Sequence, residues 1–367
     1  MEKVLFNGNL TSRLGYGCMR FAKVEGTEFD IDVEKSTPLL EKALSGGITY
    51  FDTAYPYHGG QSEKFIASVL SSRDRDSYYL ATKMPIWEAN SLDDCIRIFE
   101  EQLKNLKTDH IDYYLIHALN KDRFEKVKEF KLYEYLLEQK EQGRIKNLGF
   151  SFHDHPTVLK EIISTYKFDF AQIQLNVIDW TLQSADKQYQ ILTEAGIPIV
   201  VMEPLRGGRL VQNELTNGVD ITSLLFRYVA SLENVHVILS GMSNLEQVEE
   251  NIKTFSHLEP LNEEEKKTLD MFKTRFFESR VVPCTKCEYC QPCTKDIKIP
   301  ALFESFNNYL LTKDKDRFIT TMASFETSAR SCIKCQKCIK ACPQHIDIIK
   351  KLEECDSTYR YLANTKV

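Results

Sequence analysis

The sequence predicts an α/β protein: a (β/α)8 TIM barrel followed by a small, mainly α-helical, cysteine-rich domain. Two observations carry this prediction. Short apolar runs alternate with longer amphipathic stretches eight times between about residue 13 and residue 255. Nine of the eleven cysteines then fall between Cys284 and Cys355. We therefore expect a barrel domain over residues 1–280 and a second domain over residues 281–367.

Each of the eight units has a run of strand length followed by a segment of helical period. Eight such regular units favour parallel strands closed into a barrel over an open doubly wound sheet, with the first few residues covering the bottom. The expected strands are Leu14–Met19, Thr49–Ala54, Tyr78–Met84, Ile111–Ala118, Lys146–Phe152, Phe170–Asn176, Ile197–Glu203 and Val235–Met242. The expected barrel helices are Val33–Ser45, Ser62–Leu70, Leu92–Leu106, Phe130–Gln142, Thr157–Tyr166, Asp186–Glu194, Ser223–Leu232 and Asn244–Phe255. Further helices are expected at Asn262–Glu278, Pro300–Asn308 and Asp316–Thr327.

Composition and charge exclude several classes of function. The 367 residues carry a net charge of -6, which argues against an electrostatic surface for nucleic acid or membrane. No apolar run is long enough to span a bilayer, and residues 1–10 lack the pattern of a secretion signal. We therefore expect a cytoplasmic protein that binds neither nucleic acid nor membrane.

Four ionisable residues are expected at the carboxyl ends of three successive strands. Asp52 ends the second strand and Tyr57 follows it in a loop, while Lys83 lies on the third strand and His117 on the fourth. In a parallel barrel these strand ends meet at one face, where active sites form. Each residue alone is as readily explained by structure, since a lysine at a strand end usually extends toward solvent and a lone histidine is usually a core group. Their convergence favours a catalytic group.

The four residue types also make chemical sense together. A phenol, with a pKa of about 10, is a poor proton donor at neutral pH. An adjacent ammonium is expected to lower the pKa of Tyr57, and Asp52 is expected to keep Lys83 charged. Tyr57 then becomes a general acid that protonates a carbonyl oxygen while hydride reaches the carbon. His117 can orient that oxygen.

With these residues the chain resembles the aldo-keto reductases. The segments Phe51-Asp52-Thr53-Ala54 and Leu115-Ile116-His117 are similar to those that carry the family's Asp–Tyr–Lys–His tetrad, here Asp52, Tyr57, Lys83 and His117. The resemblance spans roughly residues 10–252. It implies reduction of an aldehyde or ketone with a nicotinamide cofactor bound without a Gly-x-Gly-x-x-Gly motif, which we do not find after the first strand.

The resemblance also implies a set of cofactor-binding residues. Ser151 and Gln172 correspond to the pair that holds the carboxamide, although Phe152 stands where asparagine is common. Met202 takes the place of a tyrosine that stacks on the nicotinamide. NADPH is expected, with NADH as the alternative, because the last unit is similar to that of an NADP-associated branch. The remaining implied residues are Pro204, Leu205 and Arg206 at the pyrophosphate, with Arg206 as a phosphate partner, and Gly241, Ser243, Gln247, Glu250 and Asn251 at the adenosine end.

Eight of the C-terminal cysteines form two spaced groups that indicate metal ligation. The second group ends in Cys-Pro and has the spacing of the bacterial ferredoxin run, which gives three ligands to one [4Fe–4S] cluster and a fourth to another. On that pattern two clusters are expected, with one cluster or a zinc site as the alternatives. The long spacing resembles α-helical ferredoxin domains. The expected sets are Cys284, Cys287, Cys290 and Cys342 for the first cluster, and Cys332, Cys335, Cys338 and Cys293 for the second.

Three readings of function remain open at this point. The leading one is a carbonyl reductase that acts on a small-molecule aldehyde or ketone. A second is a regulatory barrel whose tail is an interaction module, and a third is an electron-transfer subunit that serves an electron-carrier protein. Hydride delivers two electrons whereas each cluster passes one, and we recognise no flavin site that would couple them. The substrate itself has no signature in the sequence.

Overall fold

The computed structural model describes residues 1–367 except 28, 213–215, 217–218 and 366–367. The chain divides into two compact units. The first, the barrel unit, comprises Met1–Leu205 and Thr222–Asn262, and the second comprises Arg206–Ile221 and Glu263–Val367. The division therefore falls near residue 262 rather than at the expected residue 280, because the helix that follows Asn262 clusters with the cysteine-rich region.

Eight parallel strands close into the expected barrel, which confirms the predicted fold class. The last strand pairs with the first, placing Ile238 opposite Leu14. Every other strand pairs with its neighbours in chain order, so the carboxyl ends of all eight meet at one face. The strands are β3 (Leu14–Gly17), β4 (Tyr50–Asp52), β5 (Tyr79–Met84), β6 (Ile111–Leu119), β7 (Ile145–Phe152), β8 (Phe170–Gln174), β9 (Ile199–Met202) and β10 (Val235–Ser240).

Side chains cap the N-termini of several barrel helices. Asp32 caps α1 by accepting from the Lys35 N–H at 3.0 Å, and Asn244 caps α10 by accepting from the Gln247 N–H at 2.9 Å. Two helices follow β6 where one was expected, since Lys131 interrupts them with a left-handed backbone, φ 55°. The helices are α1 (Val33–Ser45), α2 (Ser62–Leu70), α3 (Leu92–Leu106), α4 (Lys121–Phe130), α5 (Leu132–Glu141), α6 (Pro156–Thr165), α7 (Asp179–Leu182), α8 (Ala185–Glu194), α9 (Thr222–Ala230) and α10 (Leu245–Ser256).

An N-terminal hairpin closes the amino-terminal end of the barrel, as expected for the first residues. Strands β1 (Lys3–Phe6) and β2 (Asn9–Ser12) pair in antiparallel fashion. Phe6 is completely buried, stacks on Tyr113 with ring centroids 4.7 Å apart and meets Phe170 edge-on at 5.7 Å. Burying a ring of this size contributes roughly 2 kcal/mol relative to leaving it in water.

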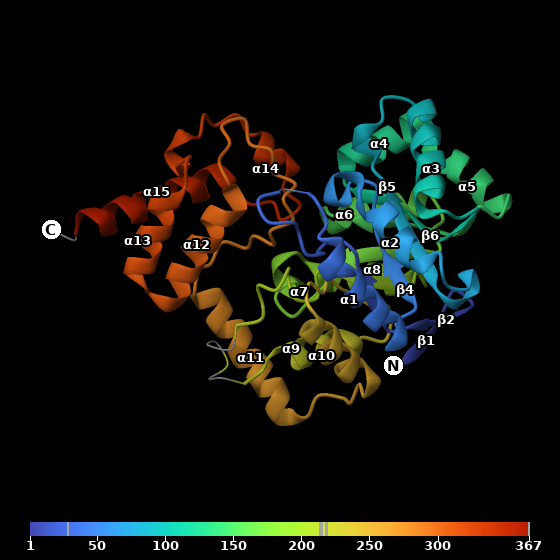
Figure 1. Ribbon diagram of the computed structural model, residues 1–367, viewed down its shortest axis with the longest axis horizontal. Coiled ribbons are helices and arrows are strands. Elements are labelled where there is room, and N and C mark those ends of the chain that lie inside the picture. The colour runs from blue at the N-terminus through green and yellow to red at the C-terminus, as the bar shows by residue number, and fades with distance from the viewer. Residues whose placement is uncertain (28, 213–215, 217–218, 366–367) are drawn as a thin grey trace. The chain divides into compact units, whose positions relative to one another are not determined.

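The second unit is mainly helical and has its own apolar core (orange to red in Figure 1). Its described helices are α11 (Glu263–Glu278), α12 (Ile299–Thr312), α13 (Lys315–Ser324), α14 (Lys337–Ala341) and α15 (Ile348–Asn364), of which α14 and α15 were not expected. Phe303, Phe318 and Leu352 are buried in the core, and several cysteines pack against it. Among the described residues no helix is long and apolar enough to cross a membrane.

Candidate active site and cysteine sites

The four predicted catalytic residues meet at the carboxyl ends of β4, β5 and β6. The Lys83 Nζ is fully buried and lies 2.7 Å from the Asp52 Oδ1, 2.6 Å from the Thr53 carbonyl oxygen and 3.4 Å from the Tyr57 hydroxyl. Tyr57 begins a short 3-10 turn (Tyr57–Gly60) directly after Pro56. Its ring lies 5.9 Å from the His117 imidazole, at an interplanar angle of 77°. The phenol is thus placed between an ammonium and an imidazole.

A distortion of β6 aims His117 at this site. The register between β6 and β7 shifts between Ile116 and Leu119, and Ala118 has a left-handed backbone, φ 51°. Such a bulge redirects side chains at a strand end, and a non-glycine residue keeps this conformation only where its surroundings hold it. The Ala118 N–H donates to the Ser151 Oγ at 2.6 Å, which helps to hold it. His117 also packs against Trp87, with centroids 4.9 Å apart.

The electrostatics of Tyr57 differ from the expectation. Burial raises the pKa of Tyr57 well above its ordinary value of 10.0, and the carboxylates of Asp52 and Glu203 raise it further. The sequence shows a lysine near the tyrosine but cannot show that the phenol is desolvated or that the ammonium is held by Asp52. In the protein without cofactor the phenol therefore keeps its proton at neutral pH.

The pKa values of two further tetrad members, His117 and Asp52, are also shifted. Burial lowers the pKa of His117 well below 6.5, and the positive charge of Lys83 lowers it further, so the imidazole is neutral. Burial raises the pKa of Asp52, while its ion pair with Lys83 opposes that rise. A neutral imidazole can donate one N–H to a carbonyl oxygen without competing as an acid.

A buried network of polar side chains holds the backbone of Lys83 in place. The Gln102 Nε2 donates to the Lys83 carbonyl oxygen at 3.0 Å and to the Glu63 Oε1 at 2.9 Å. Thr82 donates to the same Glu63 oxygen at 2.7 Å, and Tyr114 donates to the Gln102 Oε1 at 2.6 Å. Because each of these bonds is buried, the network fixes the end of β5 and with it the ammonium.

Two of the predicted nicotinamide-binding residues lie next to each other on adjacent strands. Ser151 on β7 is opposite Gln172 on β8, and both are almost completely buried. Within the described part of the chain, the buried Gln172 Oε1 has no hydrogen-bond partner, while its Nε2 lies 3.7 Å from the Met202 Sδ. A buried acceptor without a donor is costly, and a carboxamide N–H₂ group would satisfy it. These residues fit the nicotinamide.

The residues expected at the pyrophosphate belong to two different units of the structure. Pro204 is buried and Leu205 half-buried at the end of the barrel unit. Arg206 is 1% exposed and belongs to the second unit, where its guanidinium donates to the Pro283 carbonyl oxygen and to the Gln344 Oε1. This differs from the expectation that Arg206 binds phosphate, since its Nη2 already donates to two acceptors more than seventy residues away in sequence.

The residues expected at the adenosine end surround the start of α10. The Gln247 Oε1 accepts from the Ser243 N–H at 2.8 Å, and both residues are exposed. Gly241 and Glu250 are also exposed, with the Arg20 side chain lying close over Gly241. The Asn251 Nδ2, by contrast, is buried and donates to the Ser240 Oγ at 3.0 Å, a bond that ties α10 to β10. The helix N-terminus with its N–H groups suits an anion.

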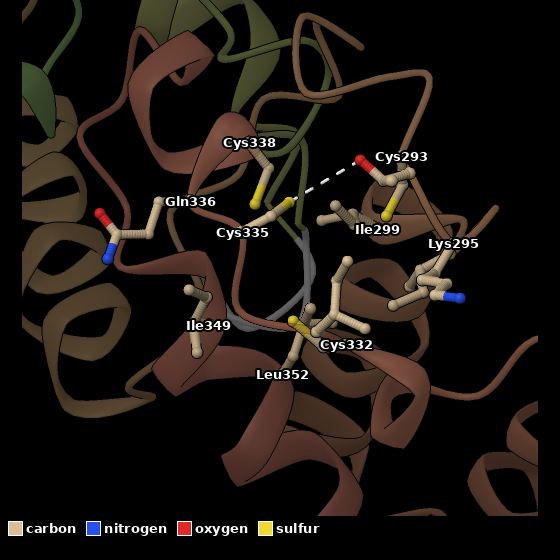
Figure 2. A pocket seen from close by; sticks show the side chains of 12 residues that line it. Cys293, Lys295, Ile299, Cys332, Cys335, Gln336, Cys338, Ile349 and Leu352 are labelled. Atoms are coloured by element: carbon tan, nitrogen blue, oxygen red, sulfur yellow. Dashed lines mark hydrogen bonds between the residues drawn. The ribbon is translucent and has the colours of Figure 1, made fainter.

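Four cysteines of the second unit line one cavity (Figure 2). The side chains of Cys332, Cys335 and Cys338 from the second group and Cys293 from the first lie around it, with apolar residues such as Ile299 and Leu352 between them. Thr294 shares a hydrogen bond with the Cys335 Sγ at 3.7 Å, drawn as the dashed line. These are the four residues expected to bind the second cluster, brought together from distant segments.

The other four cysteines also lie near one another. Burial raises the pKa of the Cys290 thiol, and the neighbouring thiols of Cys287, Cys284 and Cys342 raise it further. The first cysteine of each group accepts a backbone N–H from two residues on, Lys286 to the Cys284 Sγ at 3.5 Å and Lys334 to the Cys332 Sγ at 3.4 Å. Such bonds to sulfur are typical of iron–sulfur ligands. Within the described residues, no three or more Cys, His, Asp or Glu side chains are gathered closely enough to hold a single metal ion.

Comparison with known proteins identifies the two parts of the chain. The family model described as "Aldo/keto reductase family" matches residues 13–217, more than half of the chain. The chain belongs to the aldo/keto reductase family. A second family model, described as "4Fe-4S dicluster domain", matches residues 283–347. This aldo/keto reductase therefore carries a C-terminal iron–sulfur domain.

Individual relatives agree with this assignment. An uncharacterized oxidoreductase, YqkF of Bacillus subtilis (strain 168), is 27% identical over 70% of this chain and 91% of its own. L-galactose dehydrogenase of Arabidopsis thaliana is 25% identical over 69% and 87%. Among solved structures, the thermostable aldo-keto reductase Tm1743, bound to the inhibitor epalrestat, has a TM-score of 0.59 and 26% identity over 74% of this chain and all of its own. Aldo-keto reductase AKR11C1 from Bacillus halodurans, in its holo form, has the same fold, with a TM-score of 0.60 and 23% identity over 74% of this chain and 96% of its own.

Sequence reasoning missed several residues around Tyr57 and His117 in this aldo/keto reductase. The Arg20 Nη2 lies 3.3 Å from the Glu203 Oε1, and the charges of both residues act on the Tyr57 phenol. Arg123 of α4 lies 4.3 Å from the centre of the Trp87 ring and donates to the Ala118 carbonyl oxygen at 2.7 Å. Their shared signal is that each follows a barrel strand, where functional side chains gather.

Proposed function

We propose that this aldo/keto reductase reduces an aldehyde or ketone with a nicotinamide cofactor, and that Tyr57 donates the proton. The observation that carries the proposal is the buried Lys83 ammonium, which lies 2.7 Å from the Asp52 carboxylate and 3.4 Å from the Tyr57 hydroxyl. A lysine buried beside both a carboxylate and a phenol is costly to fold and is typical of a functional site.

Each residue of the site has a separate role in the proposed reduction. A bound NAD(P)H supplies the hydride, with two electrons, that adds to the carbonyl carbon. The Tyr57 hydroxyl gives its proton to the carbonyl oxygen, so that an alcohol forms. The neutral His117 donates an N–H to the same oxygen and orients it. Lys83 stabilises the phenolate that Tyr57 becomes, Asp52 holds Lys83 in place, and the phenolate then regains a proton from solvent.

Ser151 and Gln172 are the residues proposed to hold the carboxamide of the cofactor. The Gln172 Oε1, which no described residue satisfies, would accept the carboxamide N–H₂, and the Ser151 hydroxyl would donate to the carboxamide oxygen. Met202 on β9 would pack against the ring. We propose NADPH as the cofactor, with NADH as the alternative, on the likeness of the Gly241–Asn251 segment to an NADP-associated branch.

Replacing Tyr57 by phenylalanine tests this proposal. Tyr57→Phe should lower kcat/KM for reduction of a test aldehyde by about 10²–10⁴-fold, the usual contribution of a general acid, while NADPH binding is retained. The matched control is Tyr55→Phe, because the Tyr55 hydroxyl donates instead to the Glu101 Oε2 at 2.6 Å. Equal activity in the two variants would remove Tyr57 from the mechanism and would favour a regulatory barrel.

A second candidate function, transfer of electrons to a carrier protein, is favoured by the surface around the second cysteine set. Cys335 is exposed and lines the cavity together with the exposed Lys295, and the exposed Lys334 and Lys337 lie within two residues of Cys335 in the sequence. Lysines near an exposed cluster would attract a carrier with an acidic surface. Anaerobic titration with NADPH, followed by absorbance and electron paramagnetic resonance of the clusters, tests whether the barrel supplies these electrons. Clusters that stay oxidised while an aldehyde is reduced would separate the two functions.

The cysteines are proposed to bind two [4Fe–4S] clusters in the crossed pattern. The cavity shared by Cys293 and Cys332, Cys335 and Cys338 supports the second set. The mutual influence of Cys284, Cys287, Cys290 and Cys342 supports the first. In this pattern each group of the chain supplies three ligands to one cluster and one to the other, which ties the two groups together.

A further inference from the structure

A segment between β9 and α9 folds with the second unit instead of the barrel. The chain leaves the barrel unit after Leu205, and the described residues between 206 and 221 belong to the second unit before the barrel unit resumes at Thr222. Its first residue, Arg206, is 1% exposed and has a left-handed backbone, φ 48°. A non-glycine residue keeps this conformation only where its surroundings hold it. The contacts of Arg206 therefore hold the backbone at the start of this segment.

The Arg206 guanidinium joins the two segments that carry ligands of the first cluster. Its Nη2 donates to the Pro283 carbonyl oxygen at 2.7 Å and to the Gln344 Oε1 at 3.2 Å. Pro283 directly precedes Cys284, and Gln344 is the second residue after Cys342. Both cysteines belong to the set proposed for the first cluster. One buried side chain thus spans the two ends of that ligand set.

The charge of this region suits an anionic cluster. Arg209, on the same segment, lies 3.5 Å from the Glu304 carboxylate, and Lys286 pairs with the same group. A [4Fe–4S] cluster with four thiolate ligands carries a net negative charge, which nearby guanidinium groups stabilise.

We propose that Arg206 is a positioning residue for the first cluster and that it makes the loop after β9 dependent on that cluster. When the cluster is bound, Cys284 and Cys342 are fixed, so Pro283 and Gln344 offer Arg206 two fixed acceptors. When the cluster is lost, those acceptors separate and the segment that begins at Arg206 loses its anchor. Loss of the cluster to oxygen or to iron shortage is thereby transmitted to residue 206.

This dependence reaches the reductase through the chain itself. Pro204 and Leu205, which are proposed to bind the cofactor, directly precede Arg206. An unanchored loop must be ordered when the cofactor binds, and the lost entropy weakens binding. Cluster occupancy would therefore set the affinity for NADPH. This last step rests on the proposed function, whereas the link between Arg206 and the cluster does not.

The experiment compares Arg206→Gln and Arg206→Lys with the full-length wild type, each reconstituted anaerobically. Arg317→Gln is the matched control, because Arg317 is an exposed arginine of the same unit. Iron content and paramagnetic resonance report the clusters, and the fluorescence of bound NADPH reports its affinity. Wild type stripped of iron by a chelator is measured alongside, and circular dichroism shows whether each variant folds.

We expect Arg206→Gln to lose the signal of one cluster and to bind NADPH about tenfold more weakly, as chelated wild type does. Arg206→Lys, which keeps the charge but not the planar guanidinium that places Nη2 between the two acceptors, should fall between Arg206→Gln and wild type. Unchanged cluster signals in Arg206→Gln would overturn the proposal. Equal NADPH affinity in chelated and intact wild type would overturn the link to the loop. If wild type binds no NAD(P)H, the proposed function fails, while the cluster signals still decide the role of Arg206.

Discussion

The Lys83 ammonium and the Asp52 carboxylate form a fully buried ion pair, 2.7 Å apart, at the carboxyl ends of two neighbouring strands. Removing either charge leaves the other charge buried without its ionic partner. Asp52→Asn should lower the free energy of unfolding by about 3–5 kcal/mol, measured by urea denaturation. The double variant Asp52→Asn, Lys83→Met should recover part of that loss but no activity. Additive losses in the two single variants would show that the pair is not coupled.

The pH dependence of reduction should report the charges around Tyr57. Because burial and Glu203 raise the pKa of Tyr57, the phenol stays protonated at high pH, and kcat/KM should remain level well into the alkaline range. Glu203→Gln removes a negative charge that disfavours the phenolate, so the alkaline limb should move to lower pH. Arg20→Gln removes a positive charge and should move the limb to higher pH. Shifts in the same direction in both variants would contradict this account.

Acid stability should depend on His117. Its pKa is lowered in the folded protein, so below pH 6.5 the unfolded chain binds a proton that the folded chain does not. The free energy of unfolding should therefore fall as the pH drops below about 6.5, by up to ~1.4 kcal/mol per pH unit from this group. His117→Gln should show a shallower loss over the same range. Chemical denaturation at roughly pH 5, 6 and 7 measures the unfolding free energy of both proteins. Equal falls in wild type and His117→Gln would show that His117 does not cause the pH dependence.

Gln172 should separate cofactor binding from stability. Gln172→Leu removes a buried acceptor that no described residue satisfies, so the free energy of unfolding should stay level or rise. The affinity for NADPH should fall by about tenfold, since the carboxamide loses a partner. The comparison is Gln174→Leu, which should lose stability because Gln174 donates to the buried Asp179 at 2.6 Å. A Gln172→Leu variant with wild-type NADPH affinity would remove Gln172 from the cofactor site.

The iron content should follow the crossed ligand pattern. Anaerobically purified wild type should contain about eight iron atoms per chain, and Cys338→Ser about four, because only one [4Fe–4S] cluster loses a ligand. Cys355→Ala is the control, since Cys355 is buried in the core of the second unit and lies outside both proposed sets. Zinc in place of iron by elemental analysis would overturn the assignment for both groups.

The barrel strands could be predicted from the sequence because their apolar runs are short and regularly spaced. β5 and β7 begin and end within one residue of the expected ranges. Helix α4 could not be predicted in this way, since its sequence from Lys121 to Phe130 is dominated by charged side chains and only Phe124 and Val127 are buried. Helix α15 was missed as well.

Two features of the site depend on distances that a sequence does not contain. The lysine beside Tyr57 suggested a lowered pKa, but burial dominates and raises it. Arg206 was assigned to a phosphate because of its place after β9, whereas its acceptors, Pro283 and Gln344, are 77 and 138 residues away in the chain. In both cases the tertiary surroundings decide the chemistry. The residue types and their order nevertheless predicted which strand ends would meet.

The Phe6 ring at the amino-terminal end of the barrel affects how ligands would enter and leave the proposed site. Among the described residues, Phe6, Tyr113 and Phe170 fill that end of the barrel, whereas the tetrad lies at the opposite end of the strands. The nicotinamide proposed to bind Ser151 and Gln172 would then enter from that end of the barrel. The aldehyde proposed to contact Tyr57 would use the same entrance. The ligand that binds second would then leave first, so binding and release would follow a fixed order.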